Sequence, residues 1–459
     1  MLNSLTVRNS LVLLFSVLAY GYFGYFLERS SFNELIFLIL LLFCGSYYFI
    51  EKSKLEFKYL VLIALVFRVL FLRSIPNLSQ DFYRFLWDGR MLSNGYNPYL
   101  TTPISFIESN LFPVSQARTL FEGMGSLNAG HYTNYPPLSQ LSYWLTAIFG
   151  GDSILSGVIV LRLILILSDI GIAYFGVKTL ALLNLPKKNI FYYLLNPFVI
   201  IEIIGNLHFE ALMGCFLIIS IYFLLKEKWL ISAFLLGLSI SVKLITLLFL
   251  PLFIYYFLKS KLSLSHLNWK GFFKYIGFCF AVLITTLVTF IPFLSQELIA
   301  NFSKSVGLWF GNFEFNASVY YIIRAIMIKV IGWNLPGEVS KYLSLLTVLI
   351  IGTLSLLRSN FKPTVLLSSM LFGIFTYLLC TSTVHPWYLT IPLCVSLFTR
   401  YKFIWVWTAT IFLSYSAYGE AYGEKWYLIT LEYVIVILVF LYEVVGRNMF
   451  CYNSKNSLS

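Results

Sequence analysis

Residues 154–183 read ILSGVIVLRLILILSDIGIAYFGVKTLALL, a stretch of thirty residues with only three charged side chains. A transmembrane helix needs about 20 consecutive, mostly apolar residues, so this stretch is long enough to cross a bilayer with some tilt. Backbone N–H and C=O groups find no water partners in hydrocarbon, and a helix satisfies them internally. The stretch therefore predicts a membrane-spanning helix.

Hydrophobic residues dominate the rest of the chain as well. Of its 459 residues, 59% are hydrophobic and 11% are charged, whereas soluble domains are about 45–50% apolar and about a quarter charged. This composition excludes a soluble enzyme, a disordered chain and a coiled coil. It predicts an all-α, polytopic membrane protein with about 12–14 transmembrane helices in one domain over residues 1–459. The other expected spans are residues 10–27, 33–50, 57–75, 190–205, 209–225, 229–242, 244–258, 271–294, 339–357, 363–381, 387–399, 403–419 and 428–446.

Basic residues set the expected orientation of these spans. The formal net charge of +12 comes from lysines and arginines that stand singly or in pairs between apolar segments, without a long basic run. Cytoplasmic loops of membrane proteins are enriched in such residues. With a cytoplasmic N-terminus, the inner loops receive most of them, including Lys52, Lys54, Lys187 and Lys188.

Two longer polar segments, residues 76–153 and 295–338, then fall on the outer face. Each contains an apolar stretch that is short for a full crossing, at 138–149 and 319–331. If one of them crossed the membrane, every later loop would change sides, so we expect both to be interfacial or re-entrant helices. Loops of this length are usually functional or disordered, and these two are too aromatic to be disordered.

The first outer segment opens with SQDFYRFLWDGR at residues 79–90. Ser79 is a suitable cap, and Asn94-Gly95 a suitable end, for a short helix. On that helix Asp81, Arg84 and Asp88 share one face, while Tyr83, Trp87 and Arg90 lie on the adjacent face. The pattern also fits a purely structural alternative, in which Arg84 neutralises both aspartates and the aromatic residues belong to the membrane interface.

Other polar motifs interrupt the apolar segments. Lys243 stands between two short apolar stretches, where a lysine requires a partner or an anionic ligand. Arg162 and Asp169, on one expected helix, are predicted to pair with each other. The remaining motifs are HYTNYPPL at 131–138, LNP at 195–197, GNLHFE at 205–210, Arg324 within an apolar stretch and HPWY at 385–388.

Taken together, these strings resemble the GT-C superfamily of integral-membrane glycosyltransferases, with the nearest likeness to bacterial polyprenyl-phosphate-mannose-dependent mannosyltransferases. The likeness covers about residues 57–400 and is carried best by DFYRFLWDGR and NGYNPY within 81–99 and by YPPL at 135–138. It implies a hexose donor, by preference mannose, linked to a polyprenyl phosphate. It also implies an acceptor glycan, glycolipid or protein at the outer face of a bacterial inner or plasma membrane, and inversion at the anomeric carbon.

In this family an acid of the first outer loop acts as general base. Asp81 matches that position, but Asp88 follows on the same helix, and the sequence leaves open which of the two is the base. The sequence assigns no cofactor with certainty; a divalent metal is possible but not indicated, and no metal ligands are assigned. Neither does the sequence fix which hexose is transferred.

Residue chemistry completes the expected site. A departing lipid phosphate needs cations or hydrogen-bond donors, which suits Lys243, Arg90, Arg324 and His385. A sugar and its acceptor need aromatic faces and polar partners, for which the candidates are Arg84, Tyr83, Trp87, Tyr135, His208, Glu210 and Trp387.

Two other functions fit the same composition. A lipid-linked sugar flippase or other transporter would explain the charges within the spans, but transporters commonly show internal repeats, and none is seen in this sequence. A glycan polymerase or ligase would share the lipid-linked donor, but would ordinarily lack the acid at the start of the first outer loop. An enzyme that transfers one sugar is therefore the preferred prediction.

Overall fold

The computed structural model describes residues 2–261, 267–311, 313–419 and 423–446. Over these residues the fold is all-helical, and the one β-type contact is an isolated parallel bridge between Phe315 and Thr383. The α-helices are α1 (Leu2–Tyr25), α2 (Phe32–Glu51), α3 (Phe57–Leu70), α4 (Asp81–Ser93), α5 (Pro103–Glu108), α6 (Ala117–Ala129), α7 (Pro137–Gly150), α8 (Ile154–Leu182), α9 (Phe191–Leu194), α10 (Glu210–Leu225), α11 (Trp229–Val242), α12 (Ile254–Leu258), α13 (Trp269–Phe290), α14 (Gln296–Gly311), α15 (Val319–Ile331), α16 (Pro336–Leu357), α17 (Pro363–Cys380), α18 (Thr390–Ser396), α19 (Phe403–Thr410) and α20 (Trp426–Leu441).

The predicted all-helical, multi-span class is confirmed. By length and composition, seven helices in the described part of the chain are suited to cross a membrane, or up to eight if a bent pair is counted as one span. The other segments expected among the 12 to 14 spans are shorter or broken helices. The seven are Thr6–Tyr25, Phe32–Glu51, Ile154–Leu182, Trp269–Phe293, Pro336–Leu357, Pro363–Cys380 and Trp426–Gly446.

The bent pair shows how charged side chains support a broken helix. A π-helical turn, Val199–Gly205, meets α10 at an angle of 110°. At this break the Arg162 guanidinium donates to the carbonyl oxygens of Ile204 and Gly205, at 2.8 and 2.9 Å. A buried arginine therefore satisfies carbonyl groups that the interrupted helix leaves free.

The predicted pairing of Arg162 with Asp169 is wrong. Seven residues along a helix correspond to a rise of about 10 Å, which is too far for a direct contact. Asp169 instead accepts a hydrogen bond at 2.7 Å from Nε of Arg68 on α3, and a second from the Tyr193 hydroxyl. The pair thus joins α3 to α8.

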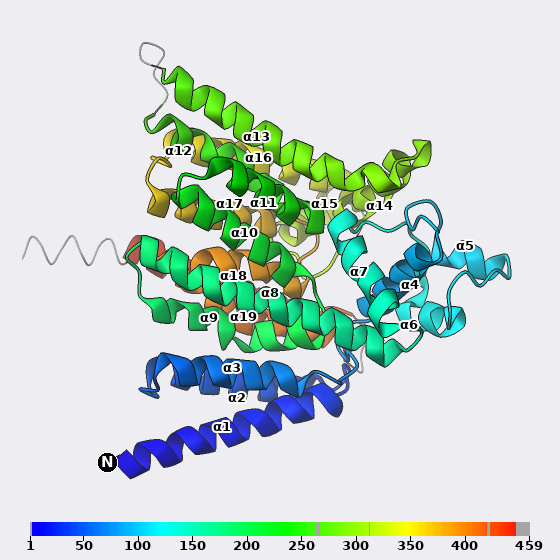
Figure 1. The fold of residues 1–459 in the computed structure, drawn as a ribbon, viewed down its shortest axis with the longest axis horizontal. Coiled ribbons are helices and arrows are strands. Elements are labelled where there is room, and N and C mark those ends of the chain that lie inside the picture. Colours follow the sequence, from blue (N-terminus) through cyan, green and yellow to red (C-terminus); the bar gives the residue numbers. More distant parts are fainter. Residues whose placement is uncertain (1, 262–266, 312, 420–422, 447–459) are drawn as a thin grey trace, which may run out of the picture.

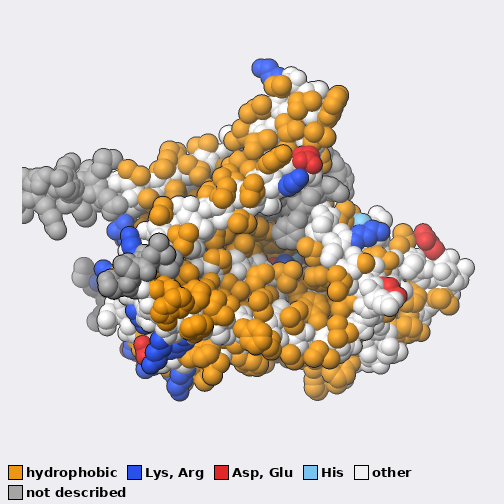
Figure 2. Space-filling view, turned by 90° about the horizontal axis from the view of Figure 1, so that it is seen from above, with side chains coloured by type: hydrophobic (Ala, Val, Ile, Leu, Met, Phe, Trp, Pro, Cys, Tyr) orange, Lys and Arg blue, Asp and Glu red, His pale blue; other side chains and the backbone are white. Residues whose placement is uncertain are grey.

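The first outer segment folds into a separate layer. The long helices α1, α8 and α13 each extend across Figure 1 with other helices between them, and α4 to α7 gather at one end of the helical layer. The apolar stretches expected to be interfacial correspond to α7 and α15. Figure 2 shows that hydrophobic side chains cover most of the flank of the helical layer. The helix α4 packs between α6 and α7, and α7 packs against α8, which fixes the layer on the helices below it.

Candidate active site

The start of α4 is held by close packing on α7. Phe85 stacks on the Tyr143 ring with centroids 4.4 Å apart. A Cβ atom on Gly89 would lie 2.0 Å from the Tyr143 carbonyl oxygen, so only glycine allows this approach of the two helices. At the first turn, the Ser79 hydroxyl oxygen accepts the Asp81 N–H at 3.3 Å. These contacts place Asp81 at the edge of a cavity.

This main cavity has a volume of about 600 Å³, in the range of small-molecule sites. It lies between the outer segment, the α1–α2 loop and the segments near residues 385 and 418. Its lining residues are Arg29, Ser30, Ser79, Gln80, Asp81, Arg84, Leu127, Asn128, His131, Tyr132, Thr133, Asn134, Tyr135, Lys243, Phe313, His385, Trp387, Tyr388 and Tyr418.

Asp81 carries a partly buried carboxylate at this cavity. The Asn128 side-chain amide donates to it at 3.2 Å. Burial raises the pKa of Asp81, and the Asn128 hydrogen bond and the positive charges of Lys243 and Arg29 offset part of that rise. A carboxylate with a raised pKa is a better proton acceptor than an ordinary aspartate.

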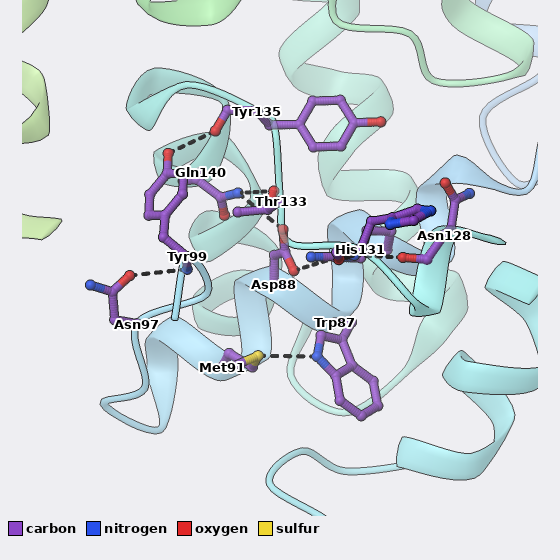
Figure 3. Close-up of polar contacts among 11 residues, drawn as sticks. Trp87, Asp88, Met91, Asn97, Tyr99, Asn128, His131, Thr133, Tyr135 and Gln140 are labelled. Atoms are coloured by element: carbon purple, nitrogen blue, oxygen red, sulfur yellow. Dashed lines mark hydrogen bonds and ion pairs between the residues drawn. The ribbon is translucent and has the colours of Figure 1, made fainter. Parts of the chain in front are cut away.

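Asp88 lies in a closed environment. It is fully buried and does not line the main cavity. Nε of Arg84 donates to one carboxylate oxygen at 2.8 Å, and the Gln140 side-chain amide donates to the other at 3.0 Å (Figure 3). Arg84 also donates to the carbonyl oxygens of Asn128 and His131, at 2.7 and 2.9 Å. The Arg84–Asp88 pair therefore holds the end of α6, where Asn128 bonds Asp81, and the segment that follows it.

Lys243 lies where three cavities meet. It follows directly after α11 and forms an ion pair with Glu210, the first residue of α10. It lines the main cavity, a small cavity shared with Asp81, His208 and Glu210, and an adjoining cavity with more apolar walls. That third cavity is lined by Asn134, Glu210, Met213, Lys243, Leu244, Ile245, Val306, Tyr377, Thr381, Thr383 and Tyr388. The ammonium group thus stands between polar and apolar space.

Trp387 belongs to a stack of rings. Its ring lies 3.7 Å from the His208 ring and 4.5 Å from the His385 ring, with interplanar angles of 16° and 8°. Two imidazoles at these distances do not fit on one face, so they cover opposite faces of Trp387. The Phe315 ring continues the stack beyond His385, at 5.1 Å. Trp387 therefore presents an edge to the cavity, and a sugar does not stack on its faces.

His385 is neutral in this arrangement. Burial, together with smaller contributions from the charges of Lys243 and Arg29, lowers the pKa of His385 to about 3. A neutral imidazole at a cavity wall can donate one hydrogen bond and accept another.

Four residues predicted for the site do not line the cavities that Asp81 and Lys243 line. Arg90 donates to the carbonyl oxygens of Ser115 and Asp152 and so ties the outer layer together. Arg324 pairs with Glu314 at 2.7 Å. Tyr83 packs on Phe82 and Gly123, and buried Trp87 donates to the Met91 sulfur at 3.0 Å.

The cavity also includes residues that the sequence did not single out. Arg29 and Tyr418 come from segments far from the first outer loop. Asn128 lies on α6, in a stretch without a recognisable motif. A polar residue near a membrane boundary is common, so only the fold could select these positions. Among the described residues, no group of three or more His, Cys, Asp or Glu is placed to hold a metal ion.

Residues 25–259 match the family described as "Alpha-(1->6)-mannopyranosyltransferase, N-terminal domain". The chain is 25% identical over 187 residues to alpha-(1->6)-mannopyranosyltransferase A of Corynebacterium glutamicum, which covers 39% of this chain and 34% of that protein. The protein of the same name from Mycobacterium tuberculosis is 25% identical over 190 residues, 41% of this chain and 35% of that one.

A third relative is the probable dolichyl pyrophosphate Man9GlcNAc2 alpha-1,3-glucosyltransferase of Dictyostelium discoideum, 23% identical over 361 residues, 71% of this chain and 66% of that protein. The matched chain thus spans about a third of each of the two mannosyltransferases. The family match covers more than half of the chain, including Asp81, Asn128, Lys243 and the whole first outer layer. The predicted likeness to membrane mannosyltransferases is confirmed, and the chain belongs to the alpha-(1->6)-mannopyranosyltransferase family.

Proposed function

We propose that this protein is an inverting mannosyltransferase, which moves mannose from a polyprenyl-phosphate donor to a hydroxyl of a mannose-containing acceptor. One observation carries the proposal: Asp81 and Lys243 line the same polar cavity, and Lys243 also lines the more apolar cavity beside it. In this arrangement the proton acceptor Asp81 suits the acceptor hydroxyl, and the cation Lys243 suits the sugar phosphate. The apolar walls beyond Lys243 suit the prenyl chain.

The reaction is a single displacement at the anomeric carbon. The acceptor oxygen forms a bond to that carbon while the bond to the phosphate oxygen breaks, and its electron pair stays on the departing polyprenyl phosphate. The acceptor proton passes to the Asp81 carboxylate. A positioned base of this kind contributes about 10²–10⁴-fold to the rate.

Lys243 faces the phosphate in this arrangement. Negative charge grows on the phosphate as the glycosidic bond breaks, and a fixed cation stabilises it without reorganisation. The ion pair with Glu210 holds the ammonium group at the boundary of the two cavities. His385, neutral and at the cavity wall, serves as a hydrogen-bond donor to the sugar or phosphate.

The active site lies on the outer side of the membrane in this proposal. Figure 2 shows Lys and Arg side chains gathered at the end of the molecule opposite the α4–α7 layer. Lys187 and Lys188 follow α8 at that end, whereas α8 starts beside α7. The enrichment of basic residues in cytoplasmic loops supports an outer position for the cavity.

The test uses the purified protein in lipid nanodiscs with radiolabelled polyprenyl-phosphate mannose and octyl α-mannoside as acceptor. We expect one mannose to be added to the 6-hydroxyl, with an anomeric configuration opposite to that of the donor, and no transfer to a 6-deoxy acceptor. Retained configuration, transfer from GDP-mannose alone, or movement of the donor across proteoliposome membranes without a new glycosidic bond would each contradict the proposal.

A further inference from the structure

Arg29 is a cavity residue contributed by the α1–α2 loop. It lines the main cavity together with Asp81, Lys243 and His385, although it precedes the first outer layer by some fifty positions. The sequence offers no motif around it, and the catalytic scheme above does not use it. Its place in the fold therefore requires a separate explanation.

The position of Arg29 is well fixed. The Asn77 side-chain amide donates to the carbonyl oxygens of Phe23 and Leu27, both at 2.8 Å, and so ties the end of α1 to the segment that leads into α4. The Arg29 guanidinium carbon lies 3.4 Å from the centre of the Tyr418 ring. A guanidinium stacked on an aromatic face keeps its N–H groups free to bind in the ring plane.

The charge of Arg29 is not balanced by a carboxylate. Three cationic side chains line the main cavity, and two of them are paired, Arg84 with Asp88 and Lys243 with Glu210. Within the described residues, Arg29 has no carboxylate at ion-pair distance, and its buried Nε has no hydrogen-bond partner. A buried donor without a partner is costly, so the cavity is suited to an anion at this point.

The charge of the donor phosphate changes during the proposed reaction. A sugar linked through a phosphodiester carries one negative charge, whereas the released polyprenyl phosphate is a monoester with a charge of about −1.5 to −2. Lys243 is already balanced by Glu210. The additional negative charge needs a further cation, and arginine binds two phosphate oxygens at once.

We propose that Arg29 binds the phosphate of the lipid-linked donor and, together with Lys243, stabilises the departing polyprenyl phosphate. This inference rests on the proposed function, because it assumes a lipid phosphate in the main cavity. If Arg29 has this role, the hairpin of α1 and α2 contributes directly to the active site, beyond a role in membrane insertion.

The experiment compares binding of farnesyl phosphate and farnesol to the full-length protein in nanodiscs, since the two ligands differ only in the phosphate. The variants are Arg29→Gln and Arg29→Lys, and the matched control is Arg73→Gln, an exposed arginine shortly after α3 that lines none of these cavities. A charged hydrogen bond to phosphate corresponds to an affinity difference of about 10- to 100-fold.

We expect Arg29→Gln to weaken farnesyl phosphate binding about 10- to 100-fold with farnesol binding unchanged, Arg29→Lys to weaken it less, and Arg73→Gln to behave as wild type. Equal phosphate affinity in wild type and Arg29→Gln would overturn the inference, as would an equal loss of farnesol binding. If wild type binds neither ligand and transfers no mannose, the proposed function itself fails. If wild type transfers mannose and Arg29→Gln binds the phosphate normally, only the assignment of Arg29 fails.

Discussion

Asp81 and Asp88 lie two turns apart on the same helix, and their carboxylates have opposite surroundings. Asp81 faces the main cavity and receives one hydrogen bond, from Asn128. Asp88 is fully buried and is held by Arg84 and Gln140. A carboxylate that is already paired has little capacity to accept a proton from a substrate, whereas one at an open cavity has both access and a raised pKa.

This difference favours Asp81 over Asp88 as the proposed base, a choice that the sequence leaves open. The structural alternative, an arginine that neutralises aspartates on a short helix, applies to Asp88 alone. The Arg84–Asp88 pair then has a positioning role, because Arg84 also holds the backbone next to Asn128. One helix thus carries the proposed base at its start and a buried, paired carboxylate in its middle.

The largest effect is expected from a substitution of Asp81, the proposed base. Asp81→Asn removes the base while keeping a side chain of the same size, and we expect mannose transfer to fall about 10²–10⁴-fold with unchanged thermal stability. Glu108→Gln, an exposed acid on α5, is the matched control and should retain wild-type turnover. Near-native turnover of a folded Asp81→Asn variant would remove Asp81 from its proposed role.

The next largest effect is expected from a substitution of the buried Asp88. Asp88→Asn leaves the Arg84 guanidinium without its counter-charge, and loss of one partner of a buried pair costs about 3–5 kcal/mol of folding free energy. We expect a clear fall in the thermal unfolding temperature, with mannose transfer per folded molecule much less affected than in Asp81→Asn. The measurement is unfolding in detergent combined with turnover normalised to folded protein.

If Asp88→Asn were fully stable and as inactive as Asp81→Asn, the assignment of the two carboxylates would be reversed.

A third change tests the packing that presents Asp81. A methyl group at Gly89 would collide with the Tyr143 carbonyl, so Gly89→Ala should separate α4 from α7 and cost about 1–3 kcal/mol. Gly21→Ala on α1, where a Cβ meets no atom within 4 Å, is the control and should be neutral or slightly stabilising. Thermal unfolding of both variants measures the difference, and equal stabilities would show that the two helices are not in close contact.

The helical class follows from local sequence, and so does the short helix that carries Asp81. Long apolar stretches leave the backbone no alternative to helix in a membrane. The number of full-length spans does not follow, because breaks such as Val199–Gly205 depend on a distant arginine that binds the freed carbonyl groups. The partner of Asp169 was likewise out of reach, since Arg68 lies about a hundred residues earlier in the chain.

The site shows the same limit. Sequence reasoning singles out Asp81 and His385 within polar strings, and Lys243 as a single charge between apolar stretches. It misjudges Trp387, whose two faces are covered by His208 and His385 rather than open to a sugar. It misses Arg29, since a lone arginine in a short loop resembles any membrane-boundary residue. Cavities are built from segments that only the tertiary fold brings together.

The smallest expected effect is a shift in the pH dependence of mannose transfer, which reports the pKa of Asp81. Transfer requires the Asp81 carboxylate in its charged form, so kcat/KM should fall as the pH drops through the pKa of Asp81. An ordinary aspartate has a pKa of about 3.9. Because burial raises the pKa of Asp81, the acidic limb of the pH–rate profile should lie at higher pH than that value. The Asn128 hydrogen bond stabilises the charged form of Asp81 and so lowers its pKa. Asn128→Ala removes this bond, so the pKa of Asp81 should rise and the acidic limb should move to higher pH. Asn94→Ala, whose amide bonds the Pro113 carbonyl outside the cavity, should leave the limb in place. An acidic limb that does not respond to Asn128→Ala would mean that a group other than Asp81 titrates, because Asn128 bonds the Asp81 carboxylate directly.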